Sequence, residues 1–373
     1  MDKQAKEYNK IKNYLFLLNI FISLGILLFL SFSGASLFIR DTSSSITSQV
    51  WVLNGIYCLI IAGVIHILSF PLSFYEGFYL EKKFDLSNQT VFGWFKDDLK
   101  RALLALVIFL IIVEFIYLFL RNFVNNWWIF AALFWFLITV VIVKITPLVI
   151  IPLFYHYIPI KDNNLKQRIC LILQRLGIEV SEIISIDQSA KSKKANAFIS
   201  GWANTRRIVL TDTLLKNFTH PEIEAVVCHE LGHYKHRDIL KIVIFGAVVS
   251  GFCFYIGNLF LKWMLPILGI GQLSDIAGLP VLLLVVFLLS LVILPLQNAF
   301  SRYLEKKADY FSLQLTNRPA EFISMITKLG KLNLADFSPS GLVEFWLYDH
   351  PPISKRIKLA EDFLAKNDES KLD

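Results

Sequence analysis

Two histidines and a glutamate are the residues of this sequence best placed to do chemistry. The stretch VVCHELGHYKHRD (226–238) holds His229 and His233 four residues apart, with Glu230 beside the first. On a helix, positions i and i+4 share a face, so both imidazoles can reach one zinc ion. In such an H-E-x-x-H helix the glutamate lies beside the metal-bound water and acts as general base during attack on a peptide carbonyl. The pattern predicts a peptidase with one Zn²⁺ per chain.

A catalytic zinc site needs a third protein ligand and an open fourth position. The metzincin pattern H-E-x-x-H-x-x-G-x-x-H is excluded, because His236 stands at the glycine position and Ile239 at the last histidine position. The segment SRYLEKKADYF (301–311) offers Glu305 and Asp309 one helical turn apart. We expect Glu305 to be the third ligand and Asp309 to accept the free N–H of a ligating histidine.

The composition indicates a membrane protein. Hydrophobic residues make up 55% of the 373 residues and charged residues 18%, below the roughly 25% charged residues of soluble domains. The mean hydropathy is +0.56. A spanning helix needs about 20 mostly apolar residues, and six segments meet this need, near 14–39, 51–75, 101–121, 127–151, 239–262 and 279–300.

The net charge of +7 points to membrane lipids as partners and not to nucleic acid, because the basic residues flank apolar runs and form no single stripe. Lys and Arg gather in 76–101, 156–238 and 301–373, while 40–50 and 263–278 hold almost none. The positive-inside rule predicts that the three basic segments, 76–101, 156–238 and 301–373, lie in the cytoplasm.

The two chemical motifs therefore fall on the same side of the membrane. Alone, H-E-x-x-H also arises by chance, and a Glu/Asp pair such as Glu305 and Asp309 is usually a solvated helix face. Because the orientation was inferred without either motif, their shared side favours a single zinc site.

The largest polar block, 156–238, has mixed structure. Helical spacing in NNLKQRICLILQRLGI predicts a helix, and the β-branched runs VSEIISID and RRIVLTD predict strands. Thr219, followed three residues later by Glu222, predicts the start of the helix that carries the histidines. One possibility is that this helix continues straight into the span near 239.

We therefore expect an all-α polytopic membrane protein of about six to seven spans, with a small α+β zinc metalloprotease domain on the cytoplasmic side. Its predicted parts are four membrane helices in 1–155, a protease segment in 156–238, two membrane helices in 239–300, and a C-terminal segment in 301–373 with the third ligand and an HPP motif.

With both motifs placed, the chain resembles the Ste24 branch of the M48 zinc peptidases, the CAAX prenyl proteases, from about residue 70 to 357. The segments that carry the resemblance are FYLEKKFDLSNQTVFGWFKDDLK (78–100), IPLFYHYIPI (151–160), NAFISGWANTRRIVLTDTLL (196–215), HELGH (229–233), SRYLEKKAD (301–309) and HPPISKRI (350–357). The resemblance implies that the spans enclose an intramembrane chamber with the zinc site at its cytoplasmic end.

The resemblance also implies roles for residues outside the zinc motifs. Asn196, Ala197 and Phe198 would pair with extended substrate backbone as an added strand. His350 would donate to the oxyanion of the tetrahedral intermediate. Arg356 would either order the site or bind the substrate carboxyl group.

Two features leave the substrate open. Asp349 precedes the HPP triplet where the resemblance leads us to expect a small serine. The Lys-, Ile- and Phe-rich composition suggests a bacterial inner-membrane protein, whose host need not make prenylated proteins. The oligomeric state does not follow from the sequence.

Three functions are compatible with a chain of this composition. The first is a zinc endopeptidase that cuts near the C-terminus of prenylated (CAAX-type) or other hydrophobic peptides. The second is an HtpX-like quality-control metalloprotease; the four spans ahead of the zinc motif and the loop 78–100 favour the first over it. The third is a non-catalytic transporter or scaffold, against which the set of a base and three ligands argues.

Overall fold

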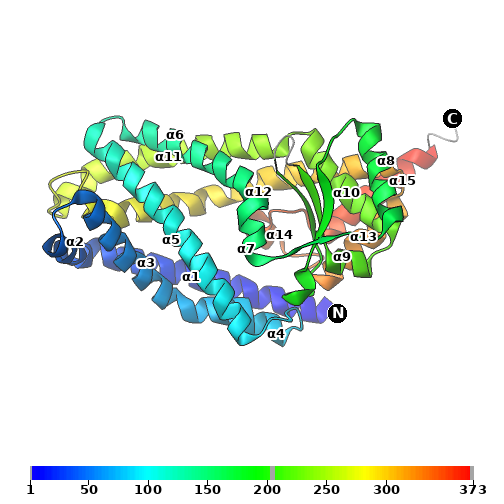
Figure 1. Ribbon diagram of the computed structural model, residues 1–373, viewed down its shortest axis with the longest axis horizontal. Coiled ribbons are helices and arrows are strands. Elements are labelled where there is room, and N and C mark those ends of the chain that lie inside the picture. The colour runs from blue at the N-terminus through cyan, green and yellow to red at the C-terminus, as the bar shows by residue number, and fades with distance from the viewer. Residues whose placement is uncertain (1, 202–205, 370–373) are drawn as a thin grey trace.

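The computed structural model describes residues 2–201 and 206–369. Long helices run side by side through one end of the molecule, and a small sheet with shorter helices forms the other end (Figure 1). The ends of the described chain both lie toward the sheet. Residues 202–205, inside the predicted 196–215 segment, lie outside the described residues.

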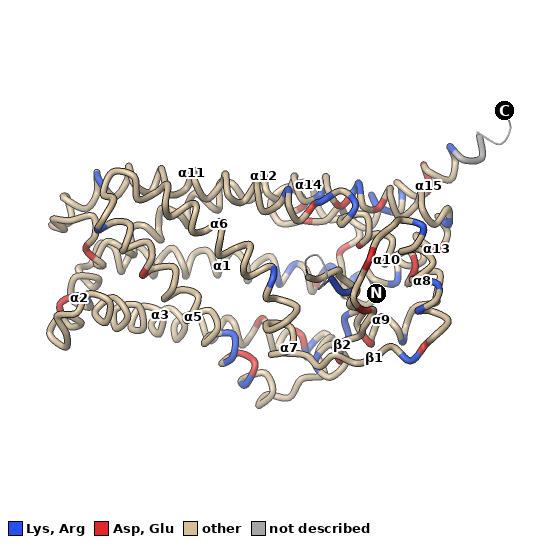
Figure 2. Tube along the Cα trace, turned by 45° about the horizontal axis from the view of Figure 1, so that its top comes forward, with Lys and Arg blue, Asp and Glu red and all other residues tan. Residues whose placement is uncertain are grey.

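Six helices of the described chain are long and apolar enough to cross a membrane, which confirms the six predicted spans. They are α1 (Asp2–Phe32), α3 (Val50–Phe74), α5 (Val91–Asn122), α6 (Trp127–Ile145), α11 (Asp238–Ile267) and α12 (Leu279–Thr316). Charged residues gather at the sheet end and are sparser at the helical end (Figure 2). Large apolar side chains such as Val248 and Val292 point outward, 69% and 73% exposed, as lipid-facing residues do. The chain is therefore a multi-pass membrane protein.

The first span differs from its prediction at both ends. α1 begins at Asp2 and ends at Phe32, so the predicted end at 39 is wrong. Gly34 has a φ of +81°, a conformation that glycine adopts without strain. It turns the chain into a separate helix, α2 (Ala35–Ile46).

Prolines mark where two spans change geometry. Pro71 lies inside α3, just before the π-helical turn η1 (Tyr75–Leu80) and the short α4 (Glu81–Lys83). Pro147 lies in a second π-helical turn, η2 (Thr146–Ile150), which leads into α7 (Ile151–Phe154). Such turns follow because proline removes a backbone hydrogen bond of the helix.

A four-stranded sheet forms the centre of the polar end. Its order is β1 (Tyr157–Pro159), β2 (Glu182–Ile186), β4 (Arg207–Thr211) and β3 (Ala197–Ser200). β2 and β4 pair in parallel and are the two strands predicted from β-branched runs. β1 was not predicted, because three residues ending in proline give no alternation to detect. Within the described residues β3 is an edge strand, whose one partner is β4.

The remaining helices cover this sheet and form its core. α8 (Asn163–Leu176) confirms the predicted amphipathic helix. α9 (Asp212–Asn217), α10 (His220–Lys235) and α13 (Pro319–Leu332) contribute buried side chains to the same core, and α15 (Ile353–Glu369) packs on α13. Smaller elements are the helix α14 (Gly341–Leu347) and the 3₁₀ turns η3 (Gln188–Ala190) and η5 (Ile276–Gly278).

α10 begins as the sequence predicts and ends earlier than a continuous helix would. Thr219 and Glu222 form a complete capping box at its start. At its other end Arg237 has a φ of +56°, in the left-handed region. This residue breaks the chain direction, so α11 starts anew at Asp238 and the continuous helix is ruled out.

Candidate metal centre

The two motif helices cross at a glycine. A Cβ on Gly232 would lie 3.0 Å from Cα of Ala308 and 3.3 Å from the Ala308 carbonyl oxygen, closer than a side chain normally approaches backbone. Glycine therefore lets the backbones of α10 and α12 meet directly. As a result, the HELGH turns of α10 face the turn of α12 from Glu305 to Asp309.

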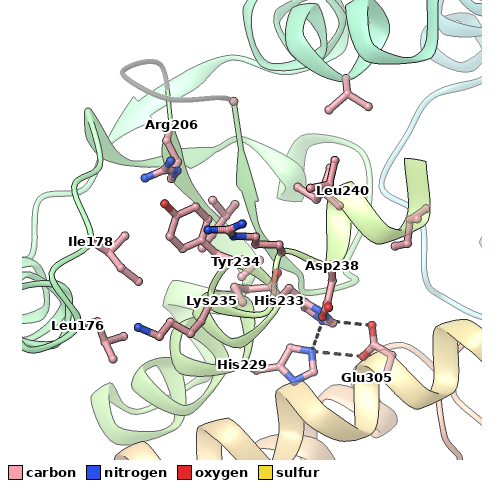
Figure 3. A pocket seen from close by; sticks show the side chains of 18 of the residues that line it. Leu176, Ile178, Arg206, His229, His233, Tyr234, Lys235, Asp238, Leu240 and Glu305 are labelled. Carbon is pink, nitrogen blue, oxygen red and sulfur yellow. Dashed lines mark hydrogen bonds and ion pairs between the residues drawn. The ribbon is translucent and has the colours of Figure 1, made fainter. Parts of the chain in front are cut away.

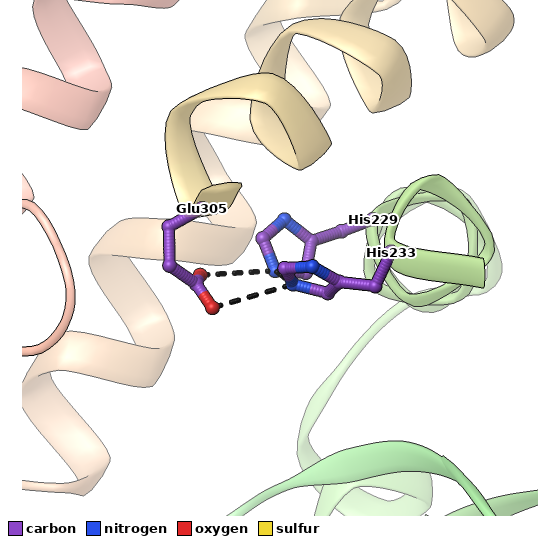
Figure 4. A group of neighbouring side chains, drawn as sticks. All are labelled: His229, His233 and Glu305. Atoms are coloured by element: carbon purple, nitrogen blue, oxygen red, sulfur yellow. Dashed lines mark hydrogen bonds and ion pairs between the residues drawn. The ribbon is translucent and has the colours of Figure 1, made fainter. Parts of the chain in front are cut away.

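Three of the predicted side chains meet between these helices (Figure 4). His229 Nε2 lies 3.2 Å from His233 Nε2 and 3.3 Å from Glu305 Oε2. His233 Nε2 lies 3.3 Å from Glu305 Oε1. Ligands about 2.0–2.1 Å from a tetrahedral ion stand roughly 3.3 Å apart. One ligand atom from each of the three residues lies within 4.8 Å of the other two, so the group could hold one metal ion.

The electrostatics of this cluster fit a cation. Glu305 Oε2 is buried and faces His229 Nε2 at 3.3 Å, and no other donor among the described residues satisfies it. Burial alone would lower the pKa of His229, but Asp309 and Glu305 outweigh it and raise the pKa to about 10. These carboxylates therefore stabilise positive charge at the point where the imidazoles meet. A divalent cation would supply that charge, so the residues present fit a metal.

Asp309 lies where the sequence places it, behind His229. Its Oδ1 is 2.8 Å from His229 Nδ1, and its side chain is fully buried. Arg356 binds the same carboxylate with two groups, Nε to Oδ2 at 2.8 Å and Nη2 to Oδ1 at 2.5 Å. The Arg356 side chain is only 11% exposed, so most of its guanidinium is committed to this buried pair. Of the two predicted roles for Arg356, this geometry favours the ordering role.

Asp238 is a residue of this site that sequence reasoning missed. Its Oδ2 lies 3.0 Å from His233 Nδ1, and its Oδ1 accepts from Lys241 Nζ at 2.8 Å. Asp238 is 1% exposed. The sequence offers only a weak signal, because an acidic residue in the first turn of a helix has an ordinary explanation in the helix dipole. Each candidate histidine ligand thus has its own carboxylate behind it.

Glu230 and His350 border the same space. Burial raises the pKa of Glu230, even though both neighbouring imidazoles act to lower it. A carboxyl group whose pKa is raised in this way is suited to taking up and returning a proton. Glu230 lines the cleft described below and makes no hydrogen bond with the histidines that flank it on α10.

His350 reaches the cluster from the segment between α14 and α15. Its Nε2 lies 3.3 Å from Glu305 Oε1, and its Nδ1 lies 2.8 Å from Asp349 Oδ1. Burial would lower the pKa of His350, but Asp349 and Glu305 raise it. Asp349, which departs from the expected serine, thus favours the imidazolium form of His350, which carries an N–H on both ring nitrogens and directs Nε2–H to Glu305.

A cleft of about 990 Å³ leads to this cluster (Figure 3). Asn196 and Ala197 at the start of β3 line one side, and Tyr234 and Leu240 line others. Phe198 is not among the lining residues, because successive side chains of a strand point to opposite faces. The cleft thus extends from the start of β3 to the histidines.

Comparison with known proteins settles the family. The sequence model of peptidase family M48 matches residues 159–363, more than half of the chain. The chain belongs to peptidase family M48. The model described as CAAX prenyl protease N-terminal, five membrane helices, matches residues 2–156. This M48 protein is accordingly a membrane metalloendopeptidase, whose substrates are peptides or proteins.

Several curated proteins resemble this M48 protease. An uncharacterized metalloprotease, YhfN of Bacillus subtilis (strain 168), is 27% identical over 361 residues, which cover 96% of this chain and 84% of that protein. CAAX prenyl protease 1 of Saccharomyces cerevisiae is 34% identical over 186 residues, 49% of this chain and 40% of that protein. A CAAX prenyl protease 1 homolog of Oryza sativa is 28% identical, covering 88% and 78%.

The fold has a solved counterpart. The crystal structure of S. mikatae Ste24p matches this chain with a TM-score of 0.85 at 23% identity, over 96% of this chain and 88% of that one. At this identity the match shows the fold. It confirms the expected combination of a helical membrane part and a small α+β protease domain.

Proposed function

We propose that His229, His233 and Glu305 hold one zinc ion and that Glu230 is the general base of peptide hydrolysis. The observation that carries this proposal is the meeting of two histidines of α10 with Glu305 of α12: the two Nε2 atoms lie 3.2 Å apart, and each lies 3.3 Å from one of the two Glu305 oxygens. Zinc bound there would polarise the scissile carbonyl and activate water at neutral pH. Asp309 and Asp238 would fix the two imidazole rings through their Nδ1 atoms.

The other residues of the site act on the peptide. The backbone of Asn196, Ala197 and Phe198 binds extended substrate as an added strand on the free edge of β3. Glu230 takes a proton from the attacking water and returns it to the leaving amine. His350, held by Asp349, donates from Nε2 to the developing oxyanion. Arg356 acts as an ordering residue through Asp309.

We further propose that the substrates are peptides with a lipid or another hydrophobic group near the cleavage site, CAAX-type peptides among them. Support comes from the match of residues 2–156 to the CAAX prenyl protease N-terminal model and from the names of the relatives. A prenyl chain inside the helical part would add binding energy of about 0.8 kcal/mol per buried CH₂.

The membrane placement follows from charge. The Lys- and Arg-rich loops 76–101, 156–238 and 301–373 support an active site that faces the cytoplasm. The similarity to the Bacillus protein supports a bacterial membrane. In this proposal 1–155 and 239–300 form the membrane part, and 156–238 with 301–373 form the protease.

Hydrolysis of a matched pair of peptides tests the proposal. The same C-terminal peptide, with and without a farnesyl group on its cysteine, is incubated with protein in vesicles, and cleavage is followed by mass spectrometry. We expect kcat/KM for the farnesylated peptide to be at least about tenfold higher, because even part of the chain's burial supplies that factor. Equal rates would contradict the lipid preference and support the HtpX-like quality-control function. Absence of cleavage of both peptides, in protein that binds zinc, would contradict the peptidase assignment to this site.

A further inference from the structure

A second hollow lies on the outer face of α12, behind the candidate metal centre. It measures about 450 Å³ and lies between α12, the end of α10 and α15. Its lining includes His236, Tyr303, Lys306, Lys307, Tyr310 and Phe311. Tyr303, Lys306, Lys307 and Tyr310 are exposed, whereas Glu305 and Asp309 between them point inward and are buried. The hollow is therefore separate from the cleft of the proposed protease.

The polar groups of this hollow have few partners. Neither Lys306 nor Lys307 forms an ion pair with a described carboxylate, and Lys307 Nζ lies only over the Tyr303 ring, 4.5 Å from its centroid. Nδ1 of His236 is buried and has no hydrogen-bond partner among the described residues. Two uncompensated ammonium groups beside a buried ring nitrogen make the hollow a place where an anion is stabilised.

The position of the lysines along α12 relates them to the bilayer surface. The apolar run of this helix ends at Phe300, and the helix continues unbroken to Thr316. At 1.5 Å per residue, Tyr303 lies about 4–5 Å and Lys307 about 10 Å beyond Phe300 along the helix. The headgroup layer is roughly 5–8 Å thick on each side of the hydrocarbon core. Side chains on a helix lean toward its N-terminus, which for α12 is the membrane side, so Tyr303 and the long side chains of Lys306 and Lys307 reach back to the height of lipid headgroups.

We propose that this hollow binds the phosphate headgroup of an anionic phospholipid. Lys306 and Lys307 contact the phosphate, and the ring of Tyr303, one turn nearer the bilayer, borders the glycerol backbone. Free phosphate carries similar charge, but the location at the membrane edge lets a lipid bind from within the bilayer with its acyl chains kept in the hydrocarbon. The proposal does not depend on the proposed function.

Lipid binding here stabilises the crossing of α10 and α12. The ring of His236 lies 5.6 Å from the ring of Phe311. A Cβ on Gly232 would lie 3.2 Å from Phe311 Cδ1, so Phe311 also packs on the helix crossing. A headgroup that contacts His236 and the lysines holds the end of α10 against α12.

The test measures lipid binding and thermal stability of the full chain. For thermal stability, purified protein is placed in phosphatidylcholine nanodiscs with and without phosphatidylglycerol, and the unfolding midpoint is measured. For lipid binding, native mass spectrometry of the protein in detergent follows bound phosphatidylglycerol. We expect phosphatidylglycerol to raise the unfolding midpoint by several degrees. The K306Q/K307Q variant should bind phosphatidylglycerol about thirtyfold more weakly, which is the combined effect expected when two lysines near a lipid surface lose their charge. K306R/K307R should keep most of the binding, which guards against a variant that fails to fold.

K82Q/K83Q is the matched control, because it removes two neighbouring lysines from the same side of the membrane outside the hollow. If K82Q/K83Q weakens binding as much as K306Q/K307Q, the effect is diffuse surface charge and the proposal is overturned. Unchanged binding in K306Q/K307Q also overturns it. If inorganic phosphate alone gives the same stabilisation in detergent, the site binds a soluble anion and the lipid assignment is wrong.

Discussion

Asp238 Oδ2 lies 3.0 Å from Nδ1 of His233, at the point where α10 ends and α11 starts. The left-handed residue Arg237 makes this contact possible, because a continuous helix would carry Asp238 five residues past His233 and away from its face. The break between the protease helix and the membrane helix thus has a chemical consequence. It gives His233 the carboxylate partner that Asp309 gives His229.

D238N should weaken zinc binding about 10–100-fold while leaving the fold intact, because an amide fixes the ring and supports its basicity less well than a carboxylate. Competition with a zinc chelator measures the affinity. D187N is the matched control, since Asp187 pairs with His156 at 2.8 Å outside the site. An unchanged zinc affinity in D238N, or an equal loss in D187N, would show that Asp238 does not support the metal.

E230Q should retain zinc and lose turnover, by about 10²–10⁴-fold, because the amide has no basic oxygen to accept the proton. Metal content by atomic spectroscopy and cleavage of a fluorogenic peptide are measured on the same sample. Turnover close to that of the unmodified protein would remove Glu230 from the role of base. Loss of zinc would instead indicate that Glu230 supports the ligands.

G232A should destabilise the protein by about 1–3 kcal/mol, because its Cβ would press on the Ala308 backbone and overpack the helix crossing. It should also weaken zinc binding, since the two helices carry different ligands and must move apart. G246A in α11 is the control: its Cβ would meet nothing within 4 Å, and alanine favours a helix by up to about 1 kcal/mol. Equal effects of the two substitutions on the unfolding midpoint would contradict the close crossing.

Glu222 should make stability depend on pH through the start of α10. Burial would raise the pKa of Glu222, but Lys328, Ser324 and Thr219 outweigh it and lower the pKa. Its contribution is therefore complete above the unfolded pKa of about 4.3 and is lost as pH falls through the lower folded value.

E222Q keeps the capping geometry and removes the charge, so it should cost about 1–2 kcal/mol at pH 7. The difference from the unmodified protein should shrink below about pH 4.3. The unfolding midpoints of E222Q and the unmodified protein, measured in detergent from pH 7 to below about pH 4.3, give this difference. E361Q, on the exposed face of α15, is the control. A difference between E222Q and the unmodified protein that stays constant with pH would exclude a contribution of the charge.

The sequence predicts the parts of this protein that depend on local pattern. The six spans follow from runs of apolar residues, and the start of α10 follows from Thr219 and Glu222. The distant pair of motif helices could be predicted to meet because the loop charges predict one side of the membrane for both and because each carries chemically matched side chains.

The rest depends on contacts that local pattern does not encode. No glycine or proline at position 237 indicates that the helix breaks there. Without knowledge of the break, Asp238 has no predicted role in the site. The sequence leaves two roles open for Arg356, ordering the site or binding the substrate carboxyl group, because its position does not reveal Asp309 as its partner. Strand β1 is too short to show alternation and forms because β2 offers it an edge.

X-ray diffraction at the zinc absorption edge tests the central claim most directly. The account predicts one anomalous peak per chain, about 2.0–2.1 Å from His229 Nε2, His233 Nε2 and a carboxylate oxygen of Glu305. In E305A the peak should weaken or vanish while the fold persists. A metal peak elsewhere, or a peak of full height in E305A, would contradict it.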